Sequence, residues 1–257
     1  MIFTKLYIRI FKIIVNILST NKKIQYIGTE YGGWYILKNT EIRDGVILSA
    51  GVGEDISFDI EMINRYGVKI VFVDPTPRAI EHITSVRKSL GNSKTKEFTE
   101  DGNQPVEAYD LKNITDHDFT MITKALYSES NLEVKFFSPP NETHVSHSIS
   151  NWQNNYKQSG KHLNVETISV NDLLNSENLK KIDILKLDIE GAEIQVIPNM
   201  LKNKIYPDQL LVEFDELHEA SIKAYIKASY VFLNLITNGY KIVKTKRFPN
   251  FLFKKID

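Results

Sequence analysis

The residues most suggestive of chemistry are two glycines and two acids in the stretch Gly51-Val52-Gly53-Glu54-Asp55. They follow an apolar run at residues 46–48 and precede a segment, 56–66, with helical character. A strand, a glycine turn and a helix place backbone N–H groups where many α/β proteins bind a nucleotide-like ligand. Two acidic side chains in such a turn would repel a phosphate group. The turn therefore favours a ligand whose positive charge or hydroxyl groups need hydrogen-bond acceptors.

Two phosphate-binding patterns are absent from this turn. A dinucleotide fingerprint needs a third glycine three residues after Gly53, but that position holds Ile56. A Walker loop needs a Gly-Lys-Ser/Thr sequence, and none follows. The missing third glycine argues against the alternative of a nucleotide-dependent enzyme such as a sugar epimerase or dehydrogenase.

Asp74 supports a nucleoside ligand that lacks phosphates. It follows the apolar stretch 68–73, which is typical of a strand buried on both faces. An acid at that place can accept both hydroxyl groups of a ribose. S-adenosylmethionine is a nucleoside without phosphates and carries a sulfonium cation, so it would suit both the acids and the glycine turn. An ordinary turn at Asp74-Pro75 is the alternative.

The elements expected around these residues alternate between strands and helices. Strands are predicted at residues 45–50, 68–73, 119–127, 182–187 and 209–214, followed by a closing antiparallel pair at 240–246 and 251–256. Further helices are predicted at 77–90, 192–201 and 221–238. This alternation predicts an α/β fold, with a mostly parallel sheet covered by helices on both faces.

Polar residues follow the predicted strands, at the edge of the sheet where a ligand should bind. The candidates for taking a proton from a hydroxyl acceptor are Asp188, Glu190, Glu213, Asp215, His144, His147 and His218. Asp188 is expected to face cofactor and acceptor, and His147 is a candidate general base. Glu190 has an alternative role as a cap for the following helix. Asp188, Glu190 and Glu213 could also hold a divalent cation, but the prediction includes no metal site.

Several motifs resemble those of the FkbM-type S-adenosylmethionine-dependent methyltransferases, from about residue 26 to residue 217. They are YGGW (31–34), LSAGVGEDISFD (48–59), VFVDPTP (71–77), HVSHSI (144–149), IDILKLDIEGAE (182–193) and LLVEF (210–214). The resemblance implies a class I methyltransferase fold, which is Rossmann-like, with about seven strands of which the final one runs antiparallel. One departure is Ser49, because many methyltransferases have an acid two residues before the first glycine. Glu54 or Asp55 is expected to replace it.

The resemblance also implies O-methylation of a hydroxyl group on a glycan, a lipid or a small metabolite. The residues expected to be catalytic are Asp188, Glu190, His147 and Glu213. The cofactor is expected to contact Gly51, Val52, Gly53, Glu54, Asp55, Asp74, Pro75, Ala125 and Asp188. The acceptor is expected to contact Tyr31, Trp34, His144 and Ser146. A non-catalytic binding module with the same fold is the alternative, and Ser49 is its only support.

Residues 1–24 are predicted to form a basic amphipathic helix ahead of a methyltransferase domain at 25–257. Lys5, Arg9 and Lys12 interrupt the apolar residues, so no run approaches the ~20 residues of a membrane-spanning helix. Residues 1–20 could lie on an anionic membrane. Alternatively, the helix docks on its own domain or on a second subunit of an oligomer.

Composition limits the partners and the compartment. Lys plus Arg and Asp plus Glu both number 32, so no global positive field indicates a nucleic-acid partner. The absence of cysteine excludes thiolate catalysis and fits a reducing compartment, so the predicted location is cytoplasmic, with membrane association as an alternative. Two long polar stretches interrupt the fold, 91–118 and 138–161, and the second is the predicted substrate loop.

Overall fold

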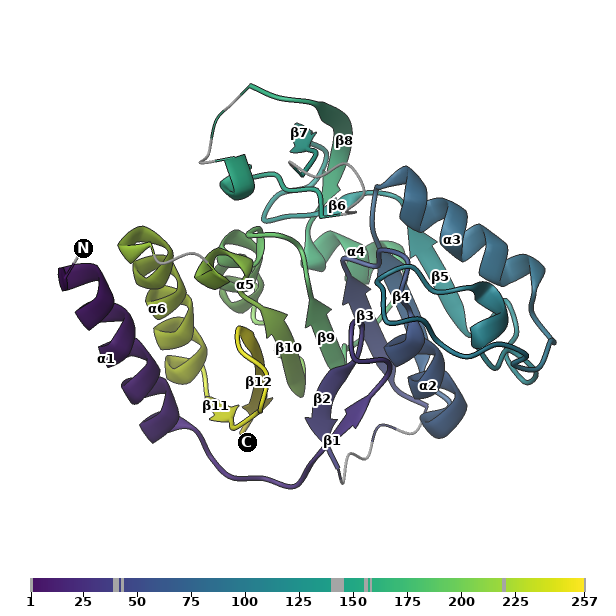
Figure 1. The fold of residues 1–257 in the computed structure, drawn as a ribbon, viewed down its shortest axis with the longest axis horizontal. Helices are drawn as coiled ribbons and strands as arrows, with labels where there is room; N and C mark the ends of the chain where they lie inside the picture. Colours follow the sequence, from purple (N-terminus) through teal and green to yellow (C-terminus); the bar gives the residue numbers. More distant parts are fainter. Residues whose placement is uncertain are drawn as a thin grey trace.

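The structure is a computed structural model, and it describes residues 2–38, 42, 44–139, 146–154, 157, 159–218 and 221–256. Its centre is a mixed sheet of seven strands in the order β11-β12-β10-β9-β3-β4-β5 (Figure 1). Five adjacent strands are parallel: β3 (Val46–Ala50), β4 (Lys69–Val73), β5 (Phe119–Ile122), β9 (Ile184–Leu187) and β10 (Gln209–Glu213). β12 (Asn250–Lys255) runs antiparallel to both of its neighbours, β10 and β11 (Tyr240–Val243). A seven-stranded α/β sheet is what the sequence predicts.

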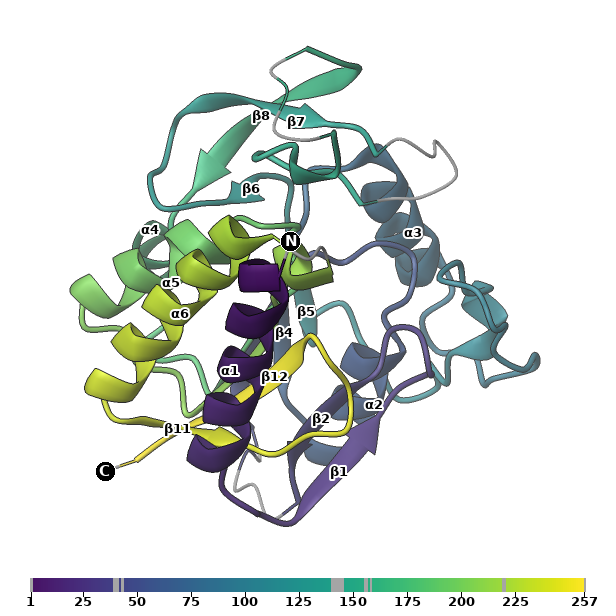
Figure 2. The same cartoon turned by 60° about the vertical axis from the view of Figure 1, so that its left-hand side comes forward.

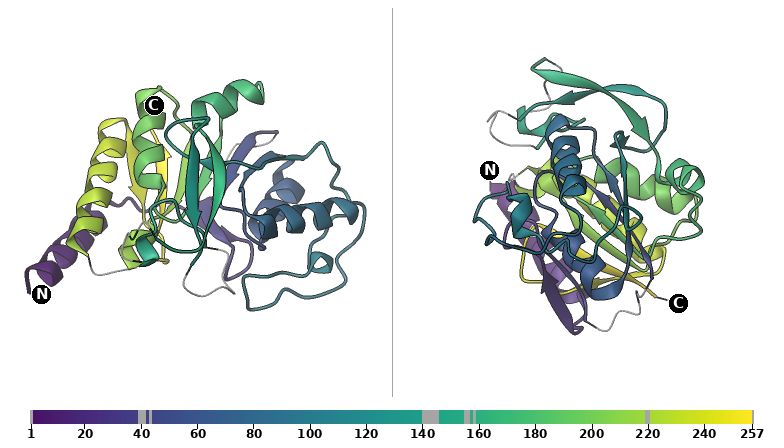
Figure 3. Two further views of the ribbon diagram at one scale, coloured as in Figure 1. Left: turned by 90° about the horizontal axis from the view of Figure 1, so that it is seen from above. Right: turned by 90° about the vertical axis from the view of Figure 1, so that its right-hand side faces the viewer.

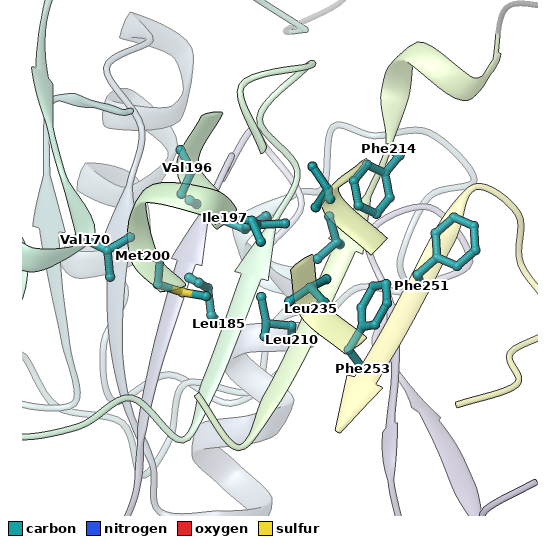
Figure 4. Close-up of a cluster of buried hydrophobic side chains, with 14 of the residues drawn as sticks. Val170, Leu185, Val196, Ile197, Met200, Leu210, Phe214, Leu235, Phe251 and Phe253 are labelled. Atoms are coloured by element: carbon teal, nitrogen blue, oxygen red, sulfur yellow. The ribbon is translucent and has the colours of Figure 1, made fainter. Parts of the chain in front are cut away.

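Helices cover both faces of this sheet. One face packs against α4 (Val170–Ser176), α5 (Glu193–Lys202) and α6 (Ile222–Thr237), and the other against α2 (Ser57–Tyr66) and α3 (Pro77–Lys88). Successive strand residues point to opposite faces, so Leu185 joins the first core and Ile184 the second. Figure 4 shows part of the first core, where Val196 and Ile197 of α5 lie near Leu185 and Leu210 of the sheet.

Local signals set several helix ends. Pro77 occupies the first turn of α3, where its missing N–H leaves no bond unmade. α2 ends at Gly67, which adopts a φ of 63° and donates its N–H to the carbonyl of Ile63. The Ser169 side chain accepts the backbone N–H of Asp172 and caps α4. A proline, a glycine and a side-chain hydrogen bond therefore set one end each of α3, α2 and α4.

The predicted strand at 119–127 is wrong in its second half. β5 ends at Ile122, which pairs with Val73, and the chain then leaves the central sheet. Residues 125–126 form β6 (Ala125–Leu126) in a second sheet with the order β6-β8-β7. Its other strands, β7 (Glu133–Phe137) and β8 (His162–Ile168), lie outside the predicted set. We call this sheet and residues 146–154 the cap, and Figure 3 shows it from above, over the middle of the molecule.

The N-terminal segment lies at the β11 edge of the central sheet, opposite the β5 edge. α1 (Ile2–Leu18) lies beside α6, as Figures 1 and 2 show. The chain then reaches β11, where the Thr20 N–H donates to the carbonyl of Ile242 at 2.8 Å. β1 (Ile24–Ile27) and β2 (Trp34–Leu37) form an antiparallel hairpin that lies outside the predicted elements. Within the described part of the chain, no helix is both long enough and apolar enough to cross a membrane.

Candidate active site

A cavity of about 530 Å³ lies between the cap and the carboxyl ends of the central parallel strands. That volume is within the range of small-molecule sites. Its wall contains every described residue that the sequence analysis assigned to cofactor, acceptor or catalysis: Tyr31, Trp34, Gly51, Val52, Gly53, Glu54, Asp55, Asp74, Pro75, Ala125, Ser146, His147, Asp188, Glu190 and Glu213. His144 falls outside the described residues.

Gly51 lets the turn after β3 pass close to the residue that follows β9. Its φ is 76°, and a Cβ at this position would lie 1.7 Å from the carbonyl oxygen of Asp188. Lys186 of β9 is buried and donates from Nζ to the carbonyl oxygen of Gly51 at 2.9 Å. β9 therefore fixes the turn at two places. Lys186 is not among the predicted site residues, although a lysine within an otherwise apolar strand is a visible signal.

Asp74 holds the same turn from β4. Its Oδ2 accepts the backbone N–H groups of Val52 at 2.9 Å and Gly53 at 3.2 Å. Its Oδ1 accepts the N–H of Thr76 at 2.8 Å and the hydroxyl of Thr76 at 2.6 Å. A carboxylate offers about four lone-pair sites, so these four bonds use its acceptor capacity. Asp74 thus orders the glycine turn, and its contact with a ribose stays a prediction.

The two acids after the glycines also have partners within the chain. Glu54 forms an ion pair with Arg78. Asp55 accepts the hydroxyl of Thr29 at 2.5 Å through Oδ2 and the N–H of Ser57 at 3.0 Å through Oδ1. Asp55 therefore joins the start of α2 to the loop after β1. A contact of either acid with the methionine part of the cofactor stays a prediction.

Ser49 does not form part of the cavity wall. It is fully buried on the face of the sheet that packs against α2. Asp59 of α2 is buried as well, and burial raises its pKa to about 6, against the opposing effect of Lys186. An acid in place of Ser49 would enter this buried region, so the departure at Ser49 says little about ligand binding.

Four carboxyl groups meet where β9 and β10 end. Asp188 and Glu190 follow β9, while Glu213 ends β10 and Asp215 follows it. Oxygen atoms of Asp188, Glu190 and Asp215 lie within 4.8 Å of one another, and ligand atoms of Glu213, Asp215 and His218 do so as well. Burial, followed by the negative charge of Glu213, raises the pKa of Asp188 to about 8. Burial also raises the pKa of Glu190 and that of Asp215.

The carboxyl cluster is suited to a cationic ligand, because a positive charge would offset the repulsion among its members. Among the described residues, no group donates a hydrogen bond to the side chain of Asp188, and Oδ2 of Asp215 is buried without a partner. A sulfonium ion would suit these oxygens. A divalent cation would too, with Asp188, Glu190 and Asp215 as its oxygen ligands.

The cap holds Glu190 in place. Oε2 of Glu190 accepts from Nε2 of Gln153 at 3.0 Å, and the hydroxyl of Ser148 donates to the backbone oxygen of Glu190 at 2.6 Å. Glu190 has a φ of 53°, in the left-handed region that a glutamate seldom occupies. The N–H of Gly191 donates to Glu193 at 2.9 Å. Glu193, rather than Glu190, therefore stabilises the turn before α5.

The two described histidines of the cavity differ in their surroundings. The ring of His147 stacks on Phe136 with centroids 5.6 Å apart, and its Nε2 lies 3.3 Å from the hydroxyl oxygen of Ser138. Nε2 of His218 lies 3.3 Å from Oε1 of Glu213, and this hydrogen bond raises the pKa of His218. Glu213 is therefore fixed by a partner, whereas Asp188 is not.

Tyr31 and Trp34 enter the cavity from the β1–β2 hairpin. Trp34 is buried, and Nζ of Lys186 lies 5.6 Å from its ring centroid. Tyr31 is exposed and lies against Gly102, where an added Cβ would meet its ring at 2.4 Å. Arg247, which is not among the predicted site residues, donates from Nη2 to the carbonyl oxygen of Tyr31 at 3.1 Å. The loop between β11 and β12 therefore holds the YGGW turn beside the cavity.

A family model described as "Methyltransferase FkbM domain" matches residues 39–241, which is most of the chain. The resemblance inferred from the motifs is therefore confirmed. The matched range includes the glycine turn and the carboxyl cluster, whereas α1 and the β1–β2 hairpin precede it. No curated protein and no solved structure matches the chain.

Proposed function

Because the chain belongs to the FkbM methyltransferase family, we propose that it transfers a methyl group from S-adenosylmethionine to a hydroxyl group of a glycan, a lipid or a small metabolite. One observation carries this proposal above the others. The glycine turn and the side chain of Asp188 share one cavity, and Gly51 touches the backbone of Asp188. A ligand lying along the turn would therefore present its reacting end to the carboxyl cluster.

The cofactor, when bound, supplies a methyl group activated by a sulfonium. The chain has to place the acceptor oxygen about 3 Å from the methyl carbon, on the side opposite the sulfur. We assign the cofactor to the part of the cavity between the glycine turn and Asp188. Pro75 and Ala125 border the same space and add apolar contacts. The negative charge of the carboxyl cluster favours the cationic cofactor over its neutral thioether product.

Asp188 is the proposed general base. Its raised pKa of about 8 brings it close to a working pH, and among the described residues its carboxyl group has no hydrogen-bond donor. A cation beside it would lower this pKa and favour the ionised form that accepts the proton of the hydroxyl group. His147, on the cap side of the cavity, is the alternative base.

The cap supplies the proposed acceptor site. Ser146, His147, Trp152 and Gln153 line the cavity from this side, and Tyr31 lines it from the β1–β2 hairpin. Aromatic rings beside amide and hydroxyl groups suit a sugar, whose faces are apolar and whose edges carry hydroxyl groups. This composition favours a glycosylated acceptor.

A methyl-transfer screen tests the proposal. Purified protein and tritium-labelled S-adenosylmethionine are incubated with glycan, glycolipid and metabolite fractions, beside the variants Asp188→Asn and His147→Gln. We expect label in a fraction that contains sugar, with loss of at least about 100-fold in Asp188→Asn and a smaller loss in His147→Gln. The reverse order would make His147 the base. If no fraction is labelled while the cofactor still binds, the non-catalytic alternative is supported instead.

A further inference from the structure

α1 packs against α6 through only one of its faces. Phe11 is buried, and its ring packs edge-on against Tyr225 at 5.1 Å and Phe232 at 5.4 Å. Where the two helices meet, the hydroxyl oxygens of Tyr7 and Ser229 lie within hydrogen-bonding distance, at 3.2 Å. The expectation that this helix docks on the chain's own domain therefore holds in the structure. One face docks on the chain's own domain, and another is left exposed.

The exposed sides of α1 and α6 carry most of the exposed apolar side chains of the described chain. Of sixteen such large side chains, eleven belong to these two helices. On α1 they are Leu6, Ile10, Ile13, Ile14, Ile17 and Leu18, and on α6 they are Ile222, Ile226, Tyr230, Leu233 and Ile236. The largest exposed fractions are 72% for Ile17 and 60% for Leu233. So dense a cluster is unusual for a surface that faces only water.

Helical spacing places the two apolar rows on either side of the same contact between the helices. Ile10 and Ile14 lie three and seven positions after Tyr7, so they share its side of α1. Ile226 and Leu233 lie three positions before and four after Ser229, so they share its side of α6. Because Tyr7 and Ser229 lie within hydrogen-bonding distance, the two rows are adjacent and form one continuous surface. We call it the α1–α6 surface.

This surface is bordered by basic side chains and contains no acid. α1 has Lys5, Arg9 and Lys12, α6 has Lys223 and Lys227, and neither helix contains an aspartate or glutamate. The three basic residues of α1 recur at helical spacing and form a row on the side away from α6, where Lys12 lies 4.2 Å from the ring centroid of Phe248. Oε1 of Glu216 lies 2.9 Å from Nζ of Lys227 and offsets its charge. Most of the excess positive charge of the two helices therefore lies on α1.

An apolar face with a basic border complements a membrane that contains anionic lipids. Apolar side chains can enter the interfacial region while the basic row meets the headgroups. A second copy of the chain fits less well. A two-fold contact would bring the same basic groups of both copies together, with no acid on either helix to offset them. We therefore propose that the α1–α6 surface docks on an anionic lipid bilayer. The proposal is independent of the methyl-transfer reaction.

Vesicle flotation with the full chain tests this docking. Vesicles of phosphatidylcholine alone are compared with vesicles that contain about 30% phosphatidylglycerol. We expect at least about tenfold more protein to float with the anionic vesicles, and we expect about 0.5 M salt to reduce that excess. Equal binding to both kinds of vesicle would overturn the proposal.

Variants separate the two helices and the two kinds of contact. Ile226→Asp combined with Leu233→Asp leaves α1 intact, and we expect it to lose about tenfold in binding. Lys5→Gln combined with Arg9→Gln should remove the preference for anionic vesicles. Leu132→Asp is the matched control, because Leu132 is an exposed apolar residue away from these helices, and it should float like the wild type. Thermal unfolding checks that each variant is folded.

Two further outcomes would overturn the proposal. One is full vesicle binding by the α6 double variant, which would show that α6 takes no part. The other is a stable dimer in sedimentation velocity without lipid, provided that the α6 double variant dissociates it. That result would assign the α1–α6 surface to a second copy of the chain.

Discussion

Nζ of Lys186 lies 2.9 Å from the carbonyl oxygen of Gly51 and donates a hydrogen bond to it. This bond joins β9 to the turn that follows β3. Asp74, at the end of β4, binds the next two N–H groups of the same turn. Three adjacent strands therefore fix the backbone along which the proposed cofactor lies. A site fixed in this way loses little conformational freedom when a ligand binds.

Replacing Lys186 should weaken cofactor binding without unfolding the protein. Lys186→Met keeps the length and packing of the side chain but removes the bond to Gly51, so the turn should become mobile. We expect the affinity for S-adenosylmethionine to fall about tenfold, since one hydrogen bond from a charged group contributes about 1.5–3 kcal/mol. Calorimetric titration measures the change. Lys202→Met, at an exposed position in the last turn of α5, is the control and should bind like the wild type.

We expect Gly51→Ala to lower the stability and the cofactor affinity much more than Gly91→Ala does, although both glycines have a positive φ. At Gly51 the new Cβ would lie 1.7 Å from the carbonyl oxygen of Asp188, so either β9 or the turn must move. Gly91 has a φ of 85°, but no atom lies within 4 Å of an added Cβ. Gly91→Ala should therefore lower the free energy of unfolding by only about 1–2 kcal/mol, which is the cost of a left-handed backbone at an alanine. Urea unfolding and cofactor titration of both variants check this, and equal losses would contradict the assigned role of Gly51.

Cofactor binding should strengthen as the pH rises. Burial and the charge of Glu213 hold the pKa of Asp188 at about 8, so its carboxyl group is largely protonated well below that pH and ionised above it. The ionised form attracts the sulfonium, so affinity for S-adenosylmethionine should rise between about pH 6 and about pH 9. S-adenosylhomocysteine has no sulfonium and should show a smaller rise. Calorimetric titrations with both ligands at several pH values measure these changes, and Asp188→Asn should remove the difference between the ligands. An affinity for S-adenosylmethionine that does not rise with pH would contradict the prediction.

Removal of metal ions should leave the activity unchanged. Asp188, Glu190 and Asp215 are close enough to share a divalent cation, but we assign the charge that offsets them to the cofactor. Methyl transfer is measured after treatment with EDTA and again after magnesium is added. Activity that disappears with EDTA and returns with magnesium would make the cluster a metal site and Asp188 a ligand of the metal.

The central sheet could be predicted because strands buried on both faces have nearly continuous apolar sequences, as at residues 69–73. The break between β5 and β6 could not, because Thr123 and Lys124 carry no glycine or proline signal. β7 and β8 of the cap are partly exposed, so their apolar pattern is weak. The β1–β2 hairpin lies outside the predicted elements because each of its strands has only four residues.

The positions of the site residues could also be predicted, because the carboxyl ends of parallel strands meet at one edge of the sheet. The hydrogen-bond partners of these residues could not be predicted. Asp55 binds Thr29, and Arg247 binds the carbonyl of Tyr31, across large separations in sequence. No local pattern indicates such contacts. Lys186 was visible as the one polar residue of β9, but its bond to Gly51 depends on how β3 and β9 pair.

The most direct test of the central claim is calorimetric titration of the purified protein with S-adenosylmethionine and S-adenosylhomocysteine, beside Gly53→Arg and Asp74→Ala. The first variant would fill the turn, and the second would free the N–H groups of Val52 and Gly53. We predict that the folded wild type binds both ligands and that both variants lose binding. A folded wild type that binds neither ligand would contradict the assignment of this cavity to S-adenosylmethionine.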